Sequence, residues 1–364
     1  MKQRKLKKGP CIILGIIVLI IILILSSFAI YKYQISPVSN DSSEIEFTVE
    51  QGSNFYSIGS LLEEKGLIRS EFFYKLYLKF NDCGSLKAGT YKLRKNMSVS
   101  QIVKLMSESS SYNPDAINIT FKEGKNMRYI AATIAEYTNN TEDDVFNLLD
   151  NSDYLNSLIN EYWFINEEIL NNQIYYSLEG YLYPNTYEFM NKNVTVEEIF
   201  KVMLDETDKK LNKYKKDLEN SSYTVHEILT LASIVELEGA NSDDRSGVAG
   251  VFYNRLNAGW SLGSDVTTYY AAKIEMSERD LYQYELNDAN SYNTRSNHLA
   301  GKLPVGPICN PSINSIVATL YPESHDYYYF VADKNKKTYF TKTNSEHLRK
   351  KQELIEAGLW YTYE

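Results

Sequence analysis

The sequence predicts an α+β protein with a single N-terminal transmembrane helix, a membrane-proximal α/β region and a helix-rich α+β domain. Three features support this organisation. An apolar run without charge covers residues 11–30, a strand–glycine–helix pattern begins at residue 47 and again at residue 119, and apolar residues follow helical spacing over residues 225–238. A chain of 364 residues is long enough for two or three domains with their own cores.

Residues 11–30 (CIILGIIVLIIILILSSFAI) form the predicted transmembrane helix. At 1.5 Å per residue such a run spans roughly 30 Å, the thickness of a bilayer's hydrocarbon core. Basic residues are frequent in residues 1–10, so the positive-inside rule makes this segment a cytoplasmic tail. A cleaved signal peptide is the alternative, although its apolar core is usually shorter. We therefore expect a single-pass protein of the cell membrane, with a linker over residues 31–44 and an extracytoplasmic remainder.

Composition and charge argue against several classes of protein. The formal net charge is −9, and the 38 Lys and Arg residues are spread along the chain, whereas a nucleic-acid-binding surface needs a basic face. The three cysteines suggest neither a metal cluster nor a disulfide framework, and whether Cys83 and Cys309 pair stays open. The histidines form no ligand motif, so we expect no metal and no cofactor; they are His226, His298, His325 and His347.

The region over residues 45–172 contains the two strand–glycine–helix units. The first reads FTVEQGSNFYSIGSLL and turns at Gly52, and the second reads ITFKEGKNMRYIAATI and turns at Gly124. Such a unit resembles the first half of LysM-type modules, which bind glycan strands. A common βα packing unit would give the same pattern. Between the two units, LKAGTYKL predicts a strand, and residues 98–106 predict a helix.

The C-terminal region, residues 177–364, is predicted to be mixed α+β and rich in helix. It opens on a run punctuated by Gly and Pro, SLEGYLYP, which predicts a loop. Helices are expected over residues 225–238 and 245–256, and the two strands of a hairpin over residues 327–332 and 337–341.

Glu236 is the side chain that the sequence singles out for chemistry. It lies at the border of the broad apolar face of the helix over residues 225–238, in the last turn before Gly239, a plausible C′ residue. Burial and the negative end of the helix dipole both disfavour a charged carboxyl, which suits a general acid at neutral pH. The alternative is a structural ion pair with Arg245 or Arg255.

Two segments look suited to binding a sugar. SDVTTYY (residues 264–270) follows a glycine-containing turn, and residues 291–312 form a long polar loop stiffened by prolines. Asn amides and Thr hydroxyls match sugar hydroxyls and N-acetyl groups. A purely structural loop is the alternative for each.

Seven ordered motifs in the C-terminal region resemble those of the YceG-like, or MltG-type, endolytic murein transglycosylases. They are EGYLYPNTYEF, LASIVELEG, VAGVFYNRL, LGSDVTTYYA, SYNT, KLPVGPICNPS and YYYFVAD. The N-terminal anchor, GLIRS, LKAGTY and the EG at residues 123–124 fit the membrane-proximal, LysM-like part of that family. The chain departs from the family at Val266, where a proline is common, and after Asn293, where the segment is longer.

The resemblance implies a lyase that cuts nascent peptidoglycan strands between N-acetylmuramic acid and N-acetylglucosamine, beside the peptidoglycan synthases. The catalytic acid of the family corresponds to Glu236. We expect the glycan to be bound by Glu238, Asp265, Thr267, Tyr292, Asn293 and Thr294.

Two other functions fit the same residues. A lysozyme-like hydrolase would pair Glu236 with a second carboxylate at roughly 5–9.5 Å, for which Asp265 is the best candidate. A non-catalytic glycan-binding scaffold of the wall-synthesis machinery would need neither of these two carboxylates for catalysis. Proton sharing between Glu236 and Glu238 is also open.

Overall fold

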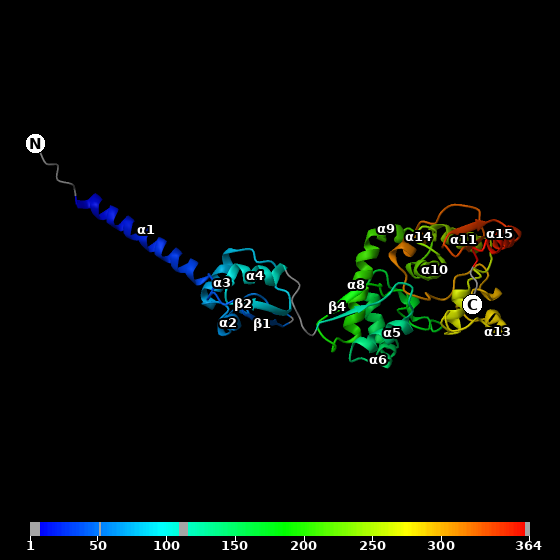
Figure 1. Cartoon of the computed structure of the whole chain (residues 1–364), viewed down its shortest axis with the longest axis horizontal. Helices are drawn as coiled ribbons and strands as arrows, with labels where there is room; N and C mark the ends of the chain where they lie inside the picture. The colour runs from blue at the N-terminus through cyan, green and yellow to red at the C-terminus, as the bar shows by residue number, and fades with distance from the viewer. Residues whose placement is uncertain (1–7, 51, 109–115, 361–364) are drawn as a thin grey trace, which may run out of the picture. The chain divides into compact units, whose positions relative to one another are not determined.

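The computed structural model describes residues 8–50, 52–108 and 116–360, with side chains described from Val18 onward. The chain divides into two compact units, Met1–Ala116 and Ile117–Glu364 (Figure 1). The first unit combines helices with one two-stranded antiparallel sheet and the second combines helices with two, so the fold is a helix-rich α+β type, as predicted.

The first unit begins with one long helix and continues as a small α/β body. Its elements are α1 (Lys8–Gln34), β1 (Glu44–Val49), α2 (Gly59–Glu64), α3 (Glu71–Phe80), β2 (Gly89–Arg94) and α4 (Val99–Glu108). Strands β1 and β2 pair antiparallel with Phe47 opposite Tyr91, and both side chains enter the core. Gly52 turns the chain after β1 with φ +82°, a conformation that favours glycine. The first strand–glycine–helix unit is therefore confirmed.

The predicted transmembrane segment, residues 11–30, falls within α1. Its apolar side chains from Val18 to Ile30 are exposed in the chain taken by itself. Over the residues that the structure describes, no helix is found with the length and apolar character needed to cross a membrane. The side chains of residues 8–17, which include part of the predicted span, lie outside the described part.

The second unit holds most of the helices. Its first half contains β3 (Ile117–Thr120), α5 (Met127–Tyr137), α6 (Glu142–Leu149), α7 (Ser152–Glu161), η1 (Glu167–Leu170), β4 (Thr186–Phe189), α8 (Val196–Leu211), η2 (Asn212–Tyr214) and α9 (Lys215–Glu219). Its second half contains α10 (Val225–Glu238), α11 (Arg245–Asn257), α12 (Asp265–Ala271), α13 (Gln283–Asn287), η3 (Asn297–Leu299), α14 (Ile313–Leu320), β5 (Tyr329–Ala332), β6 (Thr338–Thr341) and α15 (Asn344–Glu356).

The second strand–glycine–helix unit packs with the C-terminal region. Strand β3 pairs antiparallel with β4, with Ile119 opposite Tyr187, and α5 contributes Ile130 and Ile134 to the same core as the C-terminal helices. The division of the chain at Ala116 therefore comes earlier than the boundary expected near residue 172, because the partner strand of this unit lies far along the sequence.

Helix α10 lies at the centre of the second half. It has the predicted bounds, begins at a capping box between Thr224 and Glu227, and buries every side chain from Ile228 to Val235. Helices α11, α12 and α14 pack on it. The β5–β6 hairpin, which was also predicted, contacts α11 and α15. The helices over this core place the last turn of α10 beside the first turn of α14.

The segment SDVTTYY was expected to be a loop. In the structure, most of it forms helix α12. Val and Thr have low helix propensity, but burial of Val266, Thr267 and Tyr270 outweighs it. Residues 291–312 do form a long irregular segment, with the short η3 turn as the helical element described in it.

Gly180 should be intolerant of any side chain. It adopts φ +85°, and a Cβ there would lie 2.4 Å from Cβ of Pro307. We expect Gly180→Ala to destabilise the chain by roughly 2–5 kcal/mol, from left-handed strain plus the steric clash. Gly259→Ala is the matched control, since Gly259 also has positive φ but nothing within 4 Å of a Cβ. Denaturant unfolding of both variants measures the difference, and equal losses would contradict the packing argument.

Candidate active site

Glu236 lies in the last turn of α10 with its side chain 6% exposed. The backbone N–H of Ser312, the hydroxyl of Ser312 and the hydroxyl of Ser315 donate to Oε2 at 2.9, 2.6 and 2.7 Å. Nη2 of Arg245 donates to Oε1 at 2.8 Å. Four donors, one of them charged, thus surround a nearly buried carboxylate.

This arrangement corrects the electrostatics expected from α10 alone. Ser312 is the N-cap of α14, so Glu236 meets the positive end of that helix as well as the negative end of its own. The ion pair with Arg245, considered above as the alternative to a catalytic role, is present. Ser312, Ser315 and Arg245 therefore contribute hydrogen bonds and a positive charge that the position of Glu236 on α10 alone did not reveal.

Arg245 is held in place from two sides. Its Nη1 donates to the Ser312 hydroxyl at 2.8 Å. A Cβ at Gly239 would lie 2.7 Å from Cγ of Arg245, so a residue larger than glycine would displace the arginine. Gly239 has φ −68° and is therefore not the left-handed C′ residue that the sequence suggested. A glycine is required at position 239 because the Arg245 side chain passes so close to its backbone.

The glycine turn of the second strand–glycine–helix unit reaches the same carboxyl group. A Cβ at Gly124 would lie 3.5 Å from Cγ of Glu236 and 3.4 Å from Cδ2 of Leu237. Backbone hydrogen bonds fix this turn to the loop before α14: Gly124 N–H donates to Asn310 O, and Asn310 N–H donates to Lys125 O, both at 2.9 Å. The turn therefore forms one wall of the site.

Glu123, next to that glycine, interacts electrostatically with Glu236. Partial burial raises the pKa of Glu123, the negative charge of Glu236 raises it further, and Arg245 lowers it. Glu238 instead accepts a hydrogen bond from the Ser264 hydroxyl at 2.6 Å. Residues two apart on a helix do not share a face, so Glu238 is directed elsewhere. Burial raises the pKa of Glu238, with the charge of Asp265 adding to the shift.

The remaining residues predicted to bind glycan lie around α12 and differ in exposure. The Asp265 side chain is 58% exposed and pairs with Arg295 at 3.3 Å. The others are completely buried, and they are Thr267, Tyr292, Asn293 and Thr294. The Thr267 and Thr294 hydroxyls are 2.8 Å apart, and Asn293 Nδ2 donates to the carbonyls of Glu285, Leu286 and Asp288. In this conformation the four buried residues join α12 to the 291–312 loop, and their contact with glycan stays a prediction.

Glu179 is a buried carboxyl of the site region that sequence reasoning did not single out. It is 1% exposed and lies in the EGYLYP run. Its Oε2 accepts from Met127 N–H at 2.8 Å and from the Tyr270 hydroxyl at 3.0 Å, and its Oε1 accepts from Asn310 Nδ2 at 3.1 Å. Burial raises its pKa to about 8, although these donors oppose the shift. A charged residue directly before a glycine turn inside an apolar run was the available signal.

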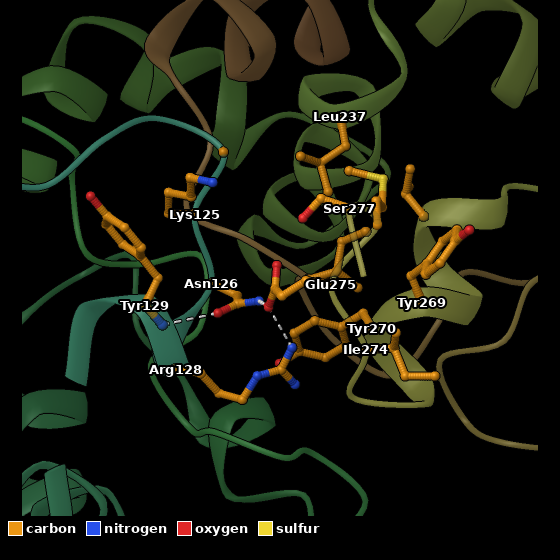
Figure 2. A pocket seen from close by; sticks show the side chains of 14 residues that line it. Lys125, Asn126, Arg128, Tyr129, Leu237, Tyr269, Tyr270, Ile274, Glu275 and Ser277 are labelled. Carbon is orange, nitrogen blue, oxygen red and sulfur yellow. Dashed lines mark hydrogen bonds and ion pairs between the residues drawn. The ribbon is translucent and has the colours of Figure 1, made fainter. Parts of the chain in front are cut away.

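A cavity of about 500 Å³ is lined by Leu237 of α10 and by Gly124, Lys125 and Asn126 of the glycine turn (Figure 2). Tyrosine and aliphatic side chains form much of its wall, including Tyr129, Tyr269, Tyr270, Ile274 and Ile308. Arg128 and Glu275 form an ion pair at 2.9 Å at its edge, as Figure 2 shows. The ammonium of Lys125 lies 5.4 Å from the centre of the Tyr129 ring.

Among the described side chains, no three His, Cys, Asp or Glu residues gather as a metal-binding group. Cys83 and Cys309 are both free thiols, which answers the pairing question left open by the sequence.

A carboxylate at a helix end, backed by an arginine and beside a tyrosine-lined cavity, is an arrangement suited to acid–base chemistry on a glycan. Comparison with known proteins agrees with this class. The model of the YceG-like family matches residues 47–353, and the chain belongs to that family.

Two relatives carry the name endolytic murein transglycosylase. The protein from Bacillus subtilis is 35% identical over 334 residues, covering 91% of each chain. The protein from Streptococcus pneumoniae (strain D39) is 30% identical over 361 residues, which cover 94% of this chain and 65% of the relative. A crystal structure of a YceG-like protein from Listeria monocytogenes has 36% identity and a TM-score of 0.60, and the match covers 84% of this chain and 99% of that one.

Glu179 should make stability depend on pH. Its pKa is about 8 in the folded chain against an ordinary 4.5, so the folded state retains a proton that the unfolded state loses. Its contribution to stability is complete below pH 4.5 and is lost as the pH rises toward 8, at up to about 1.4 kcal/mol per pH unit. We expect Glu179→Gln to reduce this slope, measured by denaturant unfolding between pH 5.5 and 8.5. Glu188→Gln, on an exposed position of β4, is the control, and parallel slopes for all three proteins would contradict the assignment.

Proposed function

We propose that the protein is an endolytic peptidoglycan lytic transglycosylase, a lyase that cleaves the β-1,4 bond from N-acetylmuramic acid to N-acetylglucosamine and leaves 1,6-anhydro ends. The observation that carries the proposal is Glu236, fixed by Arg245, Ser312 and Ser315 at the one place where α10, α14 and the Gly124 turn meet. Family membership supports it, because the relatives above are named for this activity.

The reaction requires two proton transfers and no water. A proton must reach the bridging oxygen as the glycosidic bond breaks, and the muramic C6 hydroxyl must lose its proton as it closes on C1. Glu236, acting as acid and then as base, can perform both transfers. The neighbouring N-acetyl group of the sugar can stabilise the positive charge at C1. The tyrosine rings of the cavity beside Leu237 offer faces for the apolar sides of the sugar rings.

A hydrolase of the lysozyme type is the less favoured alternative. It would need a second carboxylate facing the same bond as Glu236. Asp265, the expected partner, is exposed, ion-paired with Arg295, and interacts electrostatically with Glu238. These contacts support a role for Asp265 in a separate charge group.

We further propose that residues 11–30 anchor the chain in the cell membrane with residues 1–10 in the cytoplasm, as their charge pattern indicates. The anchor would hold the site close to nascent strands and to the peptidoglycan synthases, so that cleavage ends strand elongation. The two strand–glycine–helix units would contact the glycan in the manner of LysM modules. A non-catalytic glycan-binding scaffold remains the competing function.

The test uses the full chain in detergent micelles with uncrosslinked peptidoglycan strands, and products identified by mass spectrometry. Wild type should give new ends lighter by one water, and Glu236→Gln should lower their rate at least a hundredfold, because the proton-transfer group is lost. Glu188→Gln, which removes an exposed carboxyl on β4, should match wild type.

Other results would favour the competing functions. New ends that have gained a water would establish the hydrolase. Equal cleavage by wild type and Glu236→Gln would remove Glu236 from the mechanism. Cell-wall phenotypes unchanged by Glu236→Gln, together with no cleavage by the membrane-embedded wild type, would indicate the scaffold.

A further inference from the structure

A short cationic segment forms one edge of the cavity lined by Leu237. Lys125, Asn126 and Arg128 line the cavity from the glycine turn and the start of α5, and Glu275 lines it from the irregular segment between α12 and α13. The charged side chains of the lining are thus two cations and one carboxylate, although the whole chain has a formal net charge of −9. The lining therefore has a charge opposite in sign to that of the chain.

These groups already surround one carboxylate, that of Glu275. Nη2 of Arg128 and Nδ2 of Asn126 donate to its Oε1 at 2.9 and 3.3 Å, and Figure 2 shows the Glu275 carboxylate between the two side chains. The hydrogen bond from Arg128 lowers the pKa of Glu275 against the effect of burial, and the Asn126 amide and the charge of Lys125 lower it further. Arg128, Asn126 and Lys125 thus form a carboxylate cradle, a set of donors and charges suited to an anionic oxygen pair.

Glu275 is the more exposed partner of its ion pair. Its side chain is 59% exposed and that of Arg128 is 23% exposed. Exposed ion pairs contribute little to stability, so a second carboxylate can replace Glu275 on the guanidinium at small cost. The ammonium of Lys125 lies 5.4 Å from the centre of the Tyr129 ring and makes no ion pair with the described residues. Both cations are therefore available to a ligand that carries a carboxylate.

The carboxylate cradle is adjacent to the catalytic candidate. Gly124 lines the same cavity directly before Lys125, and a Cβ on Gly124 would lie 3.5 Å from Cγ of Glu236. The Asn310 N–H donates to Lys125 O at 2.9 Å and fixes the turn. A sugar bound at Glu236 and extending into this cavity would bring its substituents to the cradle.

The glycan offers one kind of charged group to such a cradle. Its hydroxyl and N-acetyl groups are neutral. Muramic acid carries a lactyl ether on O3 whose carboxyl is either free or joined to a peptide with carboxyl groups of its own. Guanidinium groups pair closely with carboxylates, whereas a neutral sugar gives them no counter-charge.

We propose that Arg128, Asn126 and Lys125 bind a carboxylate carried on the lactyl side of muramic acid, displacing Glu275 from Arg128. This contact determines specificity, because it favours strands that carry carboxylates over neutral glycans. The inference rests on the proposed transglycosylase function and adds a substrate contact to it.

The test measures KM and kcat for anhydro-end formation by the full chain in detergent micelles on three kinds of uncrosslinked strand. The first bears peptides, the second has its peptides removed so that the lactyl carboxylates are free, and the third has those carboxyls converted to neutral methylamides. The variants are Arg128→Gln, Lys125→Gln and Glu275→Gln. Arg349→Gln, which removes an arginine from an ion pair with a glutamate on α15, is the matched control and should match wild type on every strand.

The three variants should change KM on strands that carry carboxylates. Arg128→Gln should raise KM roughly tenfold, because a hydrogen bond to a charged group is lost. Lys125→Gln should raise it roughly threefold, since the charge removed is exposed to solvent. Glu275→Gln should lower KM, because the competing carboxylate is removed. In each case kcat should stay within about twofold of wild type, as for the loss of a contact made equally in the ground and transition states.

Salt gives a readout that a merely structural role would not change. KM of the wild type on strands that carry carboxylates should rise between about 0.05 and 0.5 M NaCl, because screening weakens the attraction, and Arg128→Gln should flatten this rise. On the methylamide strands, KM should be the same for wild type, Arg128→Gln and Lys125→Gln.

The three strands also identify the source of the carboxylate. A rise in KM for Arg128→Gln on peptide-free strands alone would assign it to the lactyl group, and a rise on peptide-bearing strands alone would assign it to the peptide. An equal rise on methylamide strands, or an unchanged KM on all three, would overturn the proposal. A KM of Glu275→Gln at or above that of wild type would contradict the displacement. If wild type forms no anhydro ends from any strand, the proposed function itself fails, which is a different result.

Discussion

The site depends on how one carboxylate is held between the ends of two helices. Glu236 lies in the last turn of α10, where the helix dipole is unfavourable to negative charge. It also meets the first turn of α14, where the dipole of that helix favours negative charge. Arg245 contributes the opposite charge and also bonds to Ser312, the residue that caps α14. The packing of α10 against α11 and α14 thus determines both where the carboxyl lies and its electrostatic environment.

A second network of hydrogen bonds connects the strand–glycine–helix unit at Gly124 to the site around Glu236. Asn310 bonds to the Lys125 carbonyl, to the Leu182 N–H and to Glu179, while Glu179 bonds to the first turn of α5 and to Tyr270 on α12. Apart from the partly buried bond to Lys125, these bonds are buried, and an unsatisfied partner there would cost about 1–3 kcal/mol each. The network therefore keeps the Gly124 turn at a fixed place against α10.

The sequence pattern predicted much of this fold because the spacing of apolar residues and the turn residues depend on neighbouring positions alone. The ends of α10, the glycine turns at Gly52 and Gly124, and the β5–β6 hairpin all follow from periodicity and turn residues. Helix α12 was missed because burial outweighed the low helix propensity of its Val and Thr residues. The pairing of β3 with β4 was missed because it joins segments far apart in the sequence.

The sequence indicated the catalytic candidate and named Arg245 as a possible partner, but it did not indicate the hydrogen-bond donors of α14. Motif and helix position both indicated Glu236, whereas Ser312 and Ser315 reach it only through tertiary packing. Whether Glu238 shares a proton with Glu236 was left open by the sequence, and in the structure Glu238 bonds to Ser264 in another direction. Spacing along one helix predicts faces of that helix, and it carries no information on which other segments those faces meet.

The most direct test of the account is a double-mutant cycle between Arg245→Met and Glu236→Gln, read as free energies of denaturant unfolding of the full chain. Because the two charges are nearly buried, Arg245→Met alone should cost roughly 3–5 kcal/mol, and adding Glu236→Gln should recover about 2 kcal/mol of that loss. Losses that add to within about 0.5 kcal/mol would show that the two residues are not coupled, and would contradict the claim that Arg245 holds the Glu236 side chain in place.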